Sequence, residues 1–184
     1  MHSRSRDPLV AARPAIPAAA LLAALALLPA TGAHAAYFAL DGSSVSFGDR
    51  VDEDLNPRGG RLRLGARLAD RFDVELHAGR SREDEVAGLD RLEVGWVGAY
   101  LKAYLPVGSR SALYALGGLA GTRIERTLGE IELEDERAGF SFGAGLETEL
   151  TERIDLSADW VRYLDREDAS GEIDAVNLGL KWYF

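Results

Sequence analysis

The last nine residues of the chain, 176–184, alternate strictly between large apolar side chains and polar or small ones. Counted back from the end in steps of two, the apolar positions are Phe184, Trp182, Leu180, Leu178 and Val176. A β-strand points successive side chains to opposite faces, so a strand here has one apolar face and one polar face. Free chain ends usually fray in water. An apolar strand that ends on an aromatic residue therefore predicts that lipid covers its apolar face.

The same alternation recurs in seven earlier segments. Together with the last one, the predicted strands are 37–47, 60–68, 72–79, 92–105, 112–125, 140–150, 154–160 and 176–184. Long and short connections alternate between them, at 48–59, 69–71, 80–91, 106–111, 126–137, 151–153 and 165–172. No segment after residue 35 keeps a 3.6-residue apolar period, so we expect little or no helix there. The pattern predicts an all-β fold, an eight-stranded antiparallel up-and-down transmembrane β-barrel with three short turns and four long loops.

Two of these segments, 37–47 and 92–105, have an irregular apolar pattern, whereas a third, 112–125, is regular. The first is interrupted by polar and small residues at 41–44, which leaves its phase open. In 92–105, one phase holds Leu92, Val94 and Trp96, and the other holds Val97, Ala99, Leu101 and Ala103. A bulge near Gly98 would reconcile the two phases. In 112–125, the expected apolar face holds Tyr114, Leu116, Ala120 and Ile124, and the opposite face holds Gly117, Gly121 and Arg123.

The alternation alone does not say which face points into the barrel. Eight-stranded barrels also occur in water, with the apolar face inside. The polar faces of this chain carry charges of both signs among glycines, and glycine suits a narrow interior better than a water-exposed strand face, which it would only weaken. We therefore expect the polar faces inside and the apolar faces against lipid. The alternative is a soluble periplasmic eight-stranded barrel that binds an apolar ligand.

Residues 1–35 have the composition of a secretory signal peptide. Arginines 4, 6 and 13 form a basic start, 18–28 is an apolar stretch, and Ala33-His34-Ala35 fits a cleavage site. We expect this peptide to be removed, so that residues 36–184 form one barrel domain. The chain has no cysteine, which excludes disulfides and thiolate metal sites. Its net charge of −9 argues against nucleic acid as a partner.

From about Ala36 to Phe184, the chain resembles the small bacterial outer-membrane β-barrel family, the OmpA/OmpX-like transmembrane domain. The resemblance is carried by the strand pattern and by the ending V-N-L-G-L-K-W-Y-F. It implies a location in the outer membrane, with both termini periplasmic and the long loops outside. It also implies that Leu180, Trp182 and Phe184 form the signal that the outer-membrane assembly machinery recognises. The resemblance further suggests a structural or surface-interaction role through the loops, whose ligand the sequence does not identify.

The polar faces predict a network of charges inside the barrel. Its expected members are Arg63, Arg67, Asp73, Glu75, Glu147, Glu149 and Asp159. Pairing across the turns at 69–71 and 151–153 sets one arginine-rich hairpin and one acidic hairpin on opposite walls. Because an eight-stranded barrel is narrow, we expect Arg63 or Arg67 to meet Glu147 or Glu149, so that the lumen is plugged rather than open.

No catalytic or ligand-binding motif accompanies this network. After cleavage His77 is the one histidine left, between Glu75 and Gly79 on a polar face, and we interpret it as part of the polar interior. The acidic runs at 83–85 and 130–136 lack the spacing of a calcium loop. The sequence therefore predicts a protein that is not an enzyme and carries no cofactor and no metal.

Overall fold

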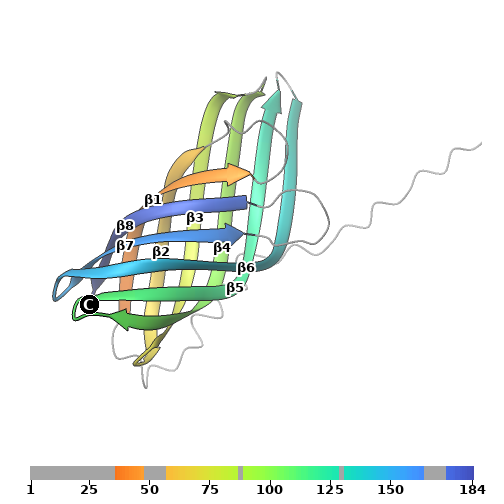
Figure 1. The fold of residues 1–184 in the computed structure, drawn as a ribbon. Helices are drawn as coiled ribbons and strands as arrows, with labels where there is room; N and C mark the ends of the chain where they lie inside the picture. Colours follow the sequence, from red (N-terminus) through yellow and green to blue (C-terminus); the bar gives the residue numbers. More distant parts are fainter. Residues whose placement is uncertain (1–35, 48–56, 87–88, 129–130, 164–172) are drawn as a thin grey trace, which may run out of the picture.

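The computed structural model describes residues 36–47, 57–86, 89–128, 131–163 and 173–184. These ranges form eight strands that hydrogen-bond in chain order into one closed antiparallel barrel (Figure 1). The strands are β1 (Ala36–Phe47), β2 (Arg58–Ala69), β3 (Phe72–Val86), β4 (Leu89–Val107), β5 (Ser111–Leu128), β6 (Ile131–Thr151), β7 (Ile154–Tyr163) and β8 (Ile173–Tyr183). The predicted fold class, strand number and order are confirmed. Within the described ranges, no helix is long and apolar enough to cross a membrane.

The outward face of the barrel is apolar over most of its height. On β8, Val176 and Leu178 are about 60% exposed, whereas their neighbours Asn177 and Lys181 are buried in the interior. The same holds on β2, where Leu62 and Leu64 are exposed and Arg61 and Arg63 are buried. Polar side chains inside and apolar ones outside is the arrangement of a membrane barrel and the reverse of a soluble one. On these strands the polar faces therefore point into the barrel and the apolar faces point outward, as expected.

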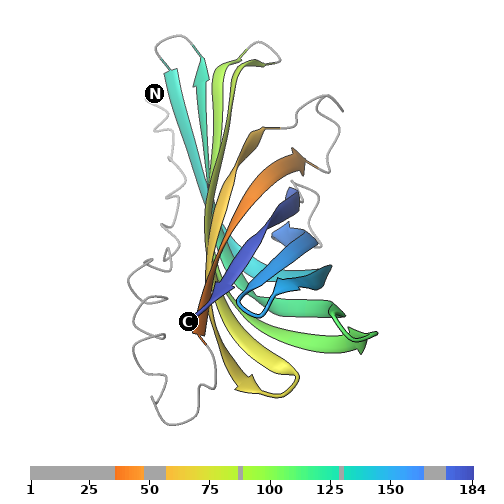
Figure 2. The same ribbon diagram turned by 90° about the vertical axis from the view of Figure 1, so that its left-hand side faces the viewer.

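Two of the predicted long loops are mostly strand. The segment 80–91 continues β3 to Val86 and begins β4 at Leu89, and the segment 126–137 continues β5 to Leu128 and begins β6 at Ile131. The expectation of charged loops there was wrong. A strand can also carry many charged residues when its outer face meets water, so charge alone does not indicate a loop. These two hairpins rise above β1, β2, β7 and β8 (Figure 2). Of the loop predicted at 48–59, residues 48–56 lie outside the described residues and Arg58 already begins β2. The loop predicted at 165–172 also lies outside the described residues.

The polarity of the sheet inverts where these hairpins rise. On β5, Tyr114, Leu116, Ala120 and Ile124 face inward, while Gly117 and Arg123 face outward. The apolar face that we expected to meet lipid on this strand is thus an interior face, and the predicted phase was wrong. In the lower part of β5 the outward face is apolar as well, with Leu113 and Leu119 exposed. Above the membrane belt the outer surface meets water, so Arg123 takes the outward position and Ile124 the inward one, as in a soluble barrel.

The same inversion explains the mixed pattern of β4, and no bulge is present at Gly98. The pairing of β4 with β3 and with β5 runs without a register shift past Gly98. Leu92, Val94 and Trp96 are inward in the upper part, and Lys102 is inward in the lower part. Bulges occur instead beside two short turns, between Arg67 and Ala69 and between Glu149 and Thr151. On β1, the phase left open by the sequence is regular, with Asp41 and Ser43 inward.

Candidate functional site

The lower half of the barrel interior, on the side of the short turns, is filled by ion pairs and hydrogen bonds. Its upper layer is built on Asp41 of β1. The Arg63 guanidinium donates two hydrogen bonds of 2.8 Å to the two carboxylate oxygens of Asp41, and Arg61 donates a third, also 2.8 Å, through Nε. Arg61 then reaches Asp159 on β7, with 2.6 Å between Nη2 and Oδ2. Bidentate pairing of this kind holds planar groups in one orientation.

Asp159 is fully satisfied by groups from three other strands. Besides Arg61, the Tyr114 hydroxyl donates to its Oδ2 over 2.7 Å, and Asn177 Nδ2 donates to its Oδ1 over 2.7 Å. Asn177 in turn accepts a hydrogen bond from Ser43. This layer therefore ties β1, β2, β5, β7 and β8 together across the lumen.

The next layer down joins two lysines to two glutamates. Glu147 of β6 accepts from Lys181 Nζ at 2.8 Å and from Lys102 Nζ at a shorter distance. Lys102 also donates to Glu75 Oε1 over 3.1 Å. The two lysine side chains and Glu75 are fully buried, and Glu147 is nearly so. Buried charges are tolerated only when paired in this way.

Glu75 also contacts a tyrosine and a histidine. The Tyr37 hydroxyl donates to Oε1 over 2.6 Å, and His77 Nε2 lies 2.8 Å from Oε2. Tyr37 reaches Glu75 across the position of Gly65, where any larger side chain would overlap the tyrosine ring. His77 thus lies within the polar interior, as the sequence led us to expect.

The lowest layer borders the short turns. Arg67 Nε pairs with Asp73 Oδ1 at 3.2 Å, and the Tyr104 hydroxyl donates to Asp73 Oδ2 over 2.7 Å. Arg67 is about one third exposed, so this pair closes the network toward the solvent at that end.

The predicted members of the network divide into three groups. Those buried inside the barrel are Arg63, Asp73, Glu75, Glu147 and Asp159. Arg67 lies at the lower edge, and Glu149 is exposed beside the turn, without a place in the network. The expected register is observed, with Arg67 opposite Asp73 and Glu149 opposite Asp155. The expected pairing across the lumen exists at one point, where 3.8 Å separates Arg63 Nη1 from Glu147 Oε1.

Four central members were missing from the predicted network. They are Asp41, Arg61, Lys102 and Lys181. Lys181 and Arg61 lie on polar faces that the sequence identifies, so the alternation of side chains along their strands was enough to predict that both belong to the network. Asp41 and Lys102 lie on the two strands whose phase was ambiguous. With them, five cations balance five carboxylates, namely Arg61, Arg63, Arg67, Lys102 and Lys181 against Asp41, Asp73, Glu75, Glu147 and Asp159.

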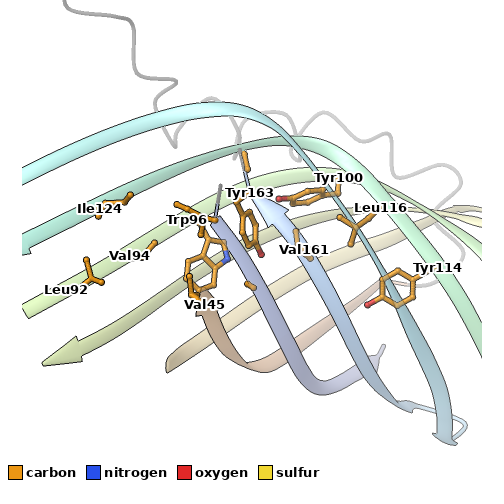
Figure 3. Close-up of a cluster of buried hydrophobic side chains, with 13 residues drawn as sticks. Val45, Leu92, Val94, Trp96, Tyr100, Tyr114, Leu116, Ile124, Val161 and Tyr163 are labelled. Atoms are coloured by element: carbon orange, nitrogen blue, oxygen red, sulfur yellow. The ribbon is translucent and has the colours of Figure 1, made fainter. Parts of the chain in front are cut away.

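An apolar layer covers this network on the side of the long hairpins. It includes Val45, Leu92, Val94, Trp96, Ile124, Val161, Tyr163, Ile173 and Ala175, each at most 3% exposed. Figure 3 shows Trp96 and Tyr163 side by side at its centre, with ring centroids 5.5 Å apart. The arrangement can exclude water and hold the wall together. In the part of the chain that the structure describes, no group of three or more acidic, histidine or cysteine side chains is placed to bind a metal.

The C-terminal strand closes the barrel against β1. Trp182 faces outward and stacks on Phe38, with ring centroids 5.1 Å apart. The Phe184 amide donates to the Ala36 carbonyl over 3.0 Å, so the two ends of the described barrel meet. Leu180 lies on the same outward face, directly opposite Leu40 of β1.

The outer membrane protein beta-barrel domain family matches residues 17–184. The chain belongs to this family. As a member of the outer membrane protein beta-barrel family, it is an outer-membrane protein embedded in the lipid of that membrane. Among proteins of curated function, none matches this chain.

Solved structures of other bacterial barrels share the fold of this family member. Neisserial surface protein A superimposes with a TM-score of 0.64 at 15% identity, over 81% of this chain and 97% of that one. Ail of Yersinia pestis, the attachment invasion locus protein, gives 0.59 at 17% identity, over 82% and 97%. The N-terminal β-barrel domain of Pseudomonas aeruginosa OprF gives 0.58 at 19% identity, over 80% and 97%. At these identities the likeness concerns the fold.

Proposed function

We propose that this protein is a closed outer-membrane barrel with a non-catalytic, surface-interaction role. The observation that carries the proposal is the contrast between the two ends of the barrel. The lower half is plugged by balanced charges, and the upper end extends into a sheet with a charged outer face. In this proposal the long hairpins lie outside the cell and both termini lie in the periplasm.

The filled interior supports a barrel without a diffusion pore. Three hydrogen-bonded layers cross the lumen. Arg63, Lys102 and Lys181 in these layers have no solvent-exposed surface. An eight-stranded barrel is just wide enough for side chains to fill it. The apolar layer around Trp96 lies above this plug and adds a second barrier to ions. Planar-bilayer recordings of the purified protein are expected to show no steady conductance.

The sheet formed by the upper parts of β3, β4, β5 and β6 supports a contact surface. Its outer face holds Arg123 with Glu125, Glu134 and Glu136 within 2.8–3.4 Å of its guanidinium nitrogens. Among the described residues, β6 pairs with β7 only from Ser141 onward, so its upper part extends beyond that strand. Phe140, at the base of this part, is 73% exposed. Sheet edges and exposed aromatic side chains are common elements of protein contacts.

The position of the termini follows from the even number of strands. Residue Ala36 and residue Phe184 lie at the end of the barrel that carries the three short turns. In this family such turns are periplasmic. We propose that residues 1–35 are a cleaved signal peptide, and that Leu180, Trp182 and Phe184 are recognised by the assembly machinery.

Thiol labelling of intact cells tests this orientation, because the chain has no cysteine of its own. We expect Glu136→Cys, on the outer face of the extended sheet, to react with a membrane-impermeant maleimide. Its control is Glu152→Cys in the β6–β7 turn, which is expected to react only after the outer membrane is permeabilised. The opposite labelling pattern would place the long hairpins in the periplasm and refute the proposed role.

A further inference from the structure

Two of the three short turns at the lower end of the barrel are built alike. Asp70 and Arg71 join β2 to β3, and Glu152 and Arg153 join β6 to β7. In each hairpin, the residue before the turn is paired directly with the residue after it. Each turn is therefore an acid followed by an arginine at the tip of a tight hairpin. We call these two the acid–arginine turns.

The strand that leads into each acid–arginine turn is also repeated. A register shift leaves Leu68 without a partner on β3, and a second shift leaves Leu150 without a partner on β7. A bulge of this kind bends its strand locally. The exposed fractions of these leucines are 49% and 52%, and that of Phe72, after the first turn, is 45%. Each turn thus lies beside apolar side chains at the lower edge of the surface that lipid covers.

The charged side chains of the acid–arginine turns are exposed, and they are Asp70, Arg71, Glu152 and Arg153. Within the described part of the chain, none of them forms an ion pair, not even with its neighbour in the same turn. The backbone carbonyl of each arginine accepts a hydrogen bond from the next strand, from the Tyr104 amide over 2.9 Å and from the Tyr183 amide over 3.0 Å. Each turn therefore holds a free carboxylate beside a free guanidinium on a fixed backbone.

This arrangement matches a molecule that carries an anion and a cation close together. The Cα atoms of successive residues are about 3.8 Å apart. In an ethanolamine phospholipid, an ethylene link likewise separates the phosphate from a primary ammonium group. A guanidinium binds phosphate in a bidentate manner, and an ammonium group donates charge-assisted hydrogen bonds to a carboxylate. A choline headgroup has no N–H to donate, and the carboxylate repels a purely anionic headgroup.

We propose that each acid–arginine turn binds the headgroup of an ethanolamine phospholipid. The phosphate lies against the arginine, the ammonium against the acid, and the acyl chains against the apolar side chains beside the turn. Because β2 and β6 are four strands apart in a ring of eight, the two sites lie on opposite sides of the barrel. In the orientation proposed above, these lipids belong to the periplasmic leaflet. The binding itself requires only that the barrel is embedded in lipid.

Native mass spectrometry of the full barrel, released from a non-ionic detergent micelle, counts the lipids bound during a titration. We expect two sites that bind phosphatidylethanolamine about threefold more tightly than phosphatidylcholine. The third short turn holds Arg110 but no acid, so a third site of this kind is not expected.

The two charges of each turn are tested separately. Asp70→Asn with Glu152→Gln is expected to abolish the difference in affinity between the two lipids. Either single change is expected to remove one of the two sites, which keeps the test valid if the double variant does not fold. Arg71→Gln with Arg153→Gln is expected to weaken the binding of both lipids about threefold, because both carry the phosphate.

The matched control removes one acid and one arginine from the same end of the barrel. Glu149 and Arg110 are exposed, and the Glu149 amide donates to the Arg110 carbonyl over 2.8 Å, but neither belongs to an acid–arginine turn. Glu149→Gln with Arg110→Gln is expected to keep both sites. Equal affinity of the unchanged protein for the two lipids, an unchanged difference in Asp70→Asn with Glu152→Gln, or the same loss in the control would each overturn the proposal. Because a micelle has no leaflets, the result is independent of the orientation that thiol labelling tests.

Discussion

Replacing Glu147 by glutamine tests the network where one carboxylate joins two lysines. Lys181 lies 2.8 Å from Glu147, and Lys102 lies closer. At an effective dielectric constant of about 20, a charge pair at 2.8 Å interacts with about 6 kcal/mol before desolvation is subtracted. Breaking a buried pair by removing one partner costs about 3–5 kcal/mol. We expect Glu147→Gln to lower the free energy of unfolding by that amount.

The second step is a double-mutant cycle with Lys181→Gln. Lys102 keeps its contact with Glu75 when Glu147 is neutral, whereas Lys181 loses its nearest carboxylate. Because Lys181→Gln removes that ammonium group, we expect a coupling energy of about 1–3 kcal/mol between the two positions. Arg63 is a weaker partner at 3.8 Å, and it keeps its bidentate contact with Asp41 when Glu147 is neutral. Arg63→Gln is therefore expected to add its own loss rather than recover stability.

Urea unfolding from lipid vesicles, followed by tryptophan fluorescence and electrophoretic mobility, supplies these free energies. Glu152→Gln, an exposed turn residue, is the control and is expected to change stability by less than about 0.5 kcal/mol. Strictly additive losses for Glu147→Gln and Lys181→Gln would show that the two side chains are not energetically coupled. A loss below about 1 kcal/mol for Glu147→Gln would show that the carboxylate is not needed in charged form.

Three further changes probe other parts of the barrel. Gly65→Ala is expected to displace Tyr37 from Glu75 and to cost about 1–3 kcal/mol, whereas Gly117→Ala, which faces outward into open space, is expected to cost far less in the same urea assay. Trp96→Ala empties the centre of the apolar layer and is expected to cost about 3–5 kcal/mol, while bilayer recordings stay silent because the charged layers below are intact. Deletion of Phe184 removes the hydrogen bond that its amide donates to the Ala36 carbonyl, and we expect less protein in the outer-membrane fraction of cells; an unchanged amount would contradict the proposed role in assembly.

The alternation of side chains was enough to predict the strands and their order. A strand has a period of two whatever surrounds it, so the two faces of β2, β3, β6, β7 and β8 could be assigned over the predicted residues, although the upper parts of β3 and β6 were predicted as loops. The short turns fixed the register of two hairpins, which placed Arg67 opposite Asp73 and Glu149 opposite Asp155. The bulges beside these turns were not anticipated, because one extra residue leaves the sequence pattern of the flanking strands intact.

The environment of each face was decided only by the tertiary structure. Tyr114, Leu116 and Ile124 have the alternation of a lipid-facing row, yet they face the interior. In the lower part of β5 the outward positions belong to Leu113 and Leu119, and Tyr114 reaches the interior charges. On β4 the mixed apolar pattern prevented the assignment of Lys102 to the interior. The contact that Lys102 makes with Glu147 was therefore not predicted. Periodicity records which residues share a face. Whether that face meets lipid, water or the lumen depends on where the residue lies in the closed barrel, and this is set by how the eight strands pair with one another.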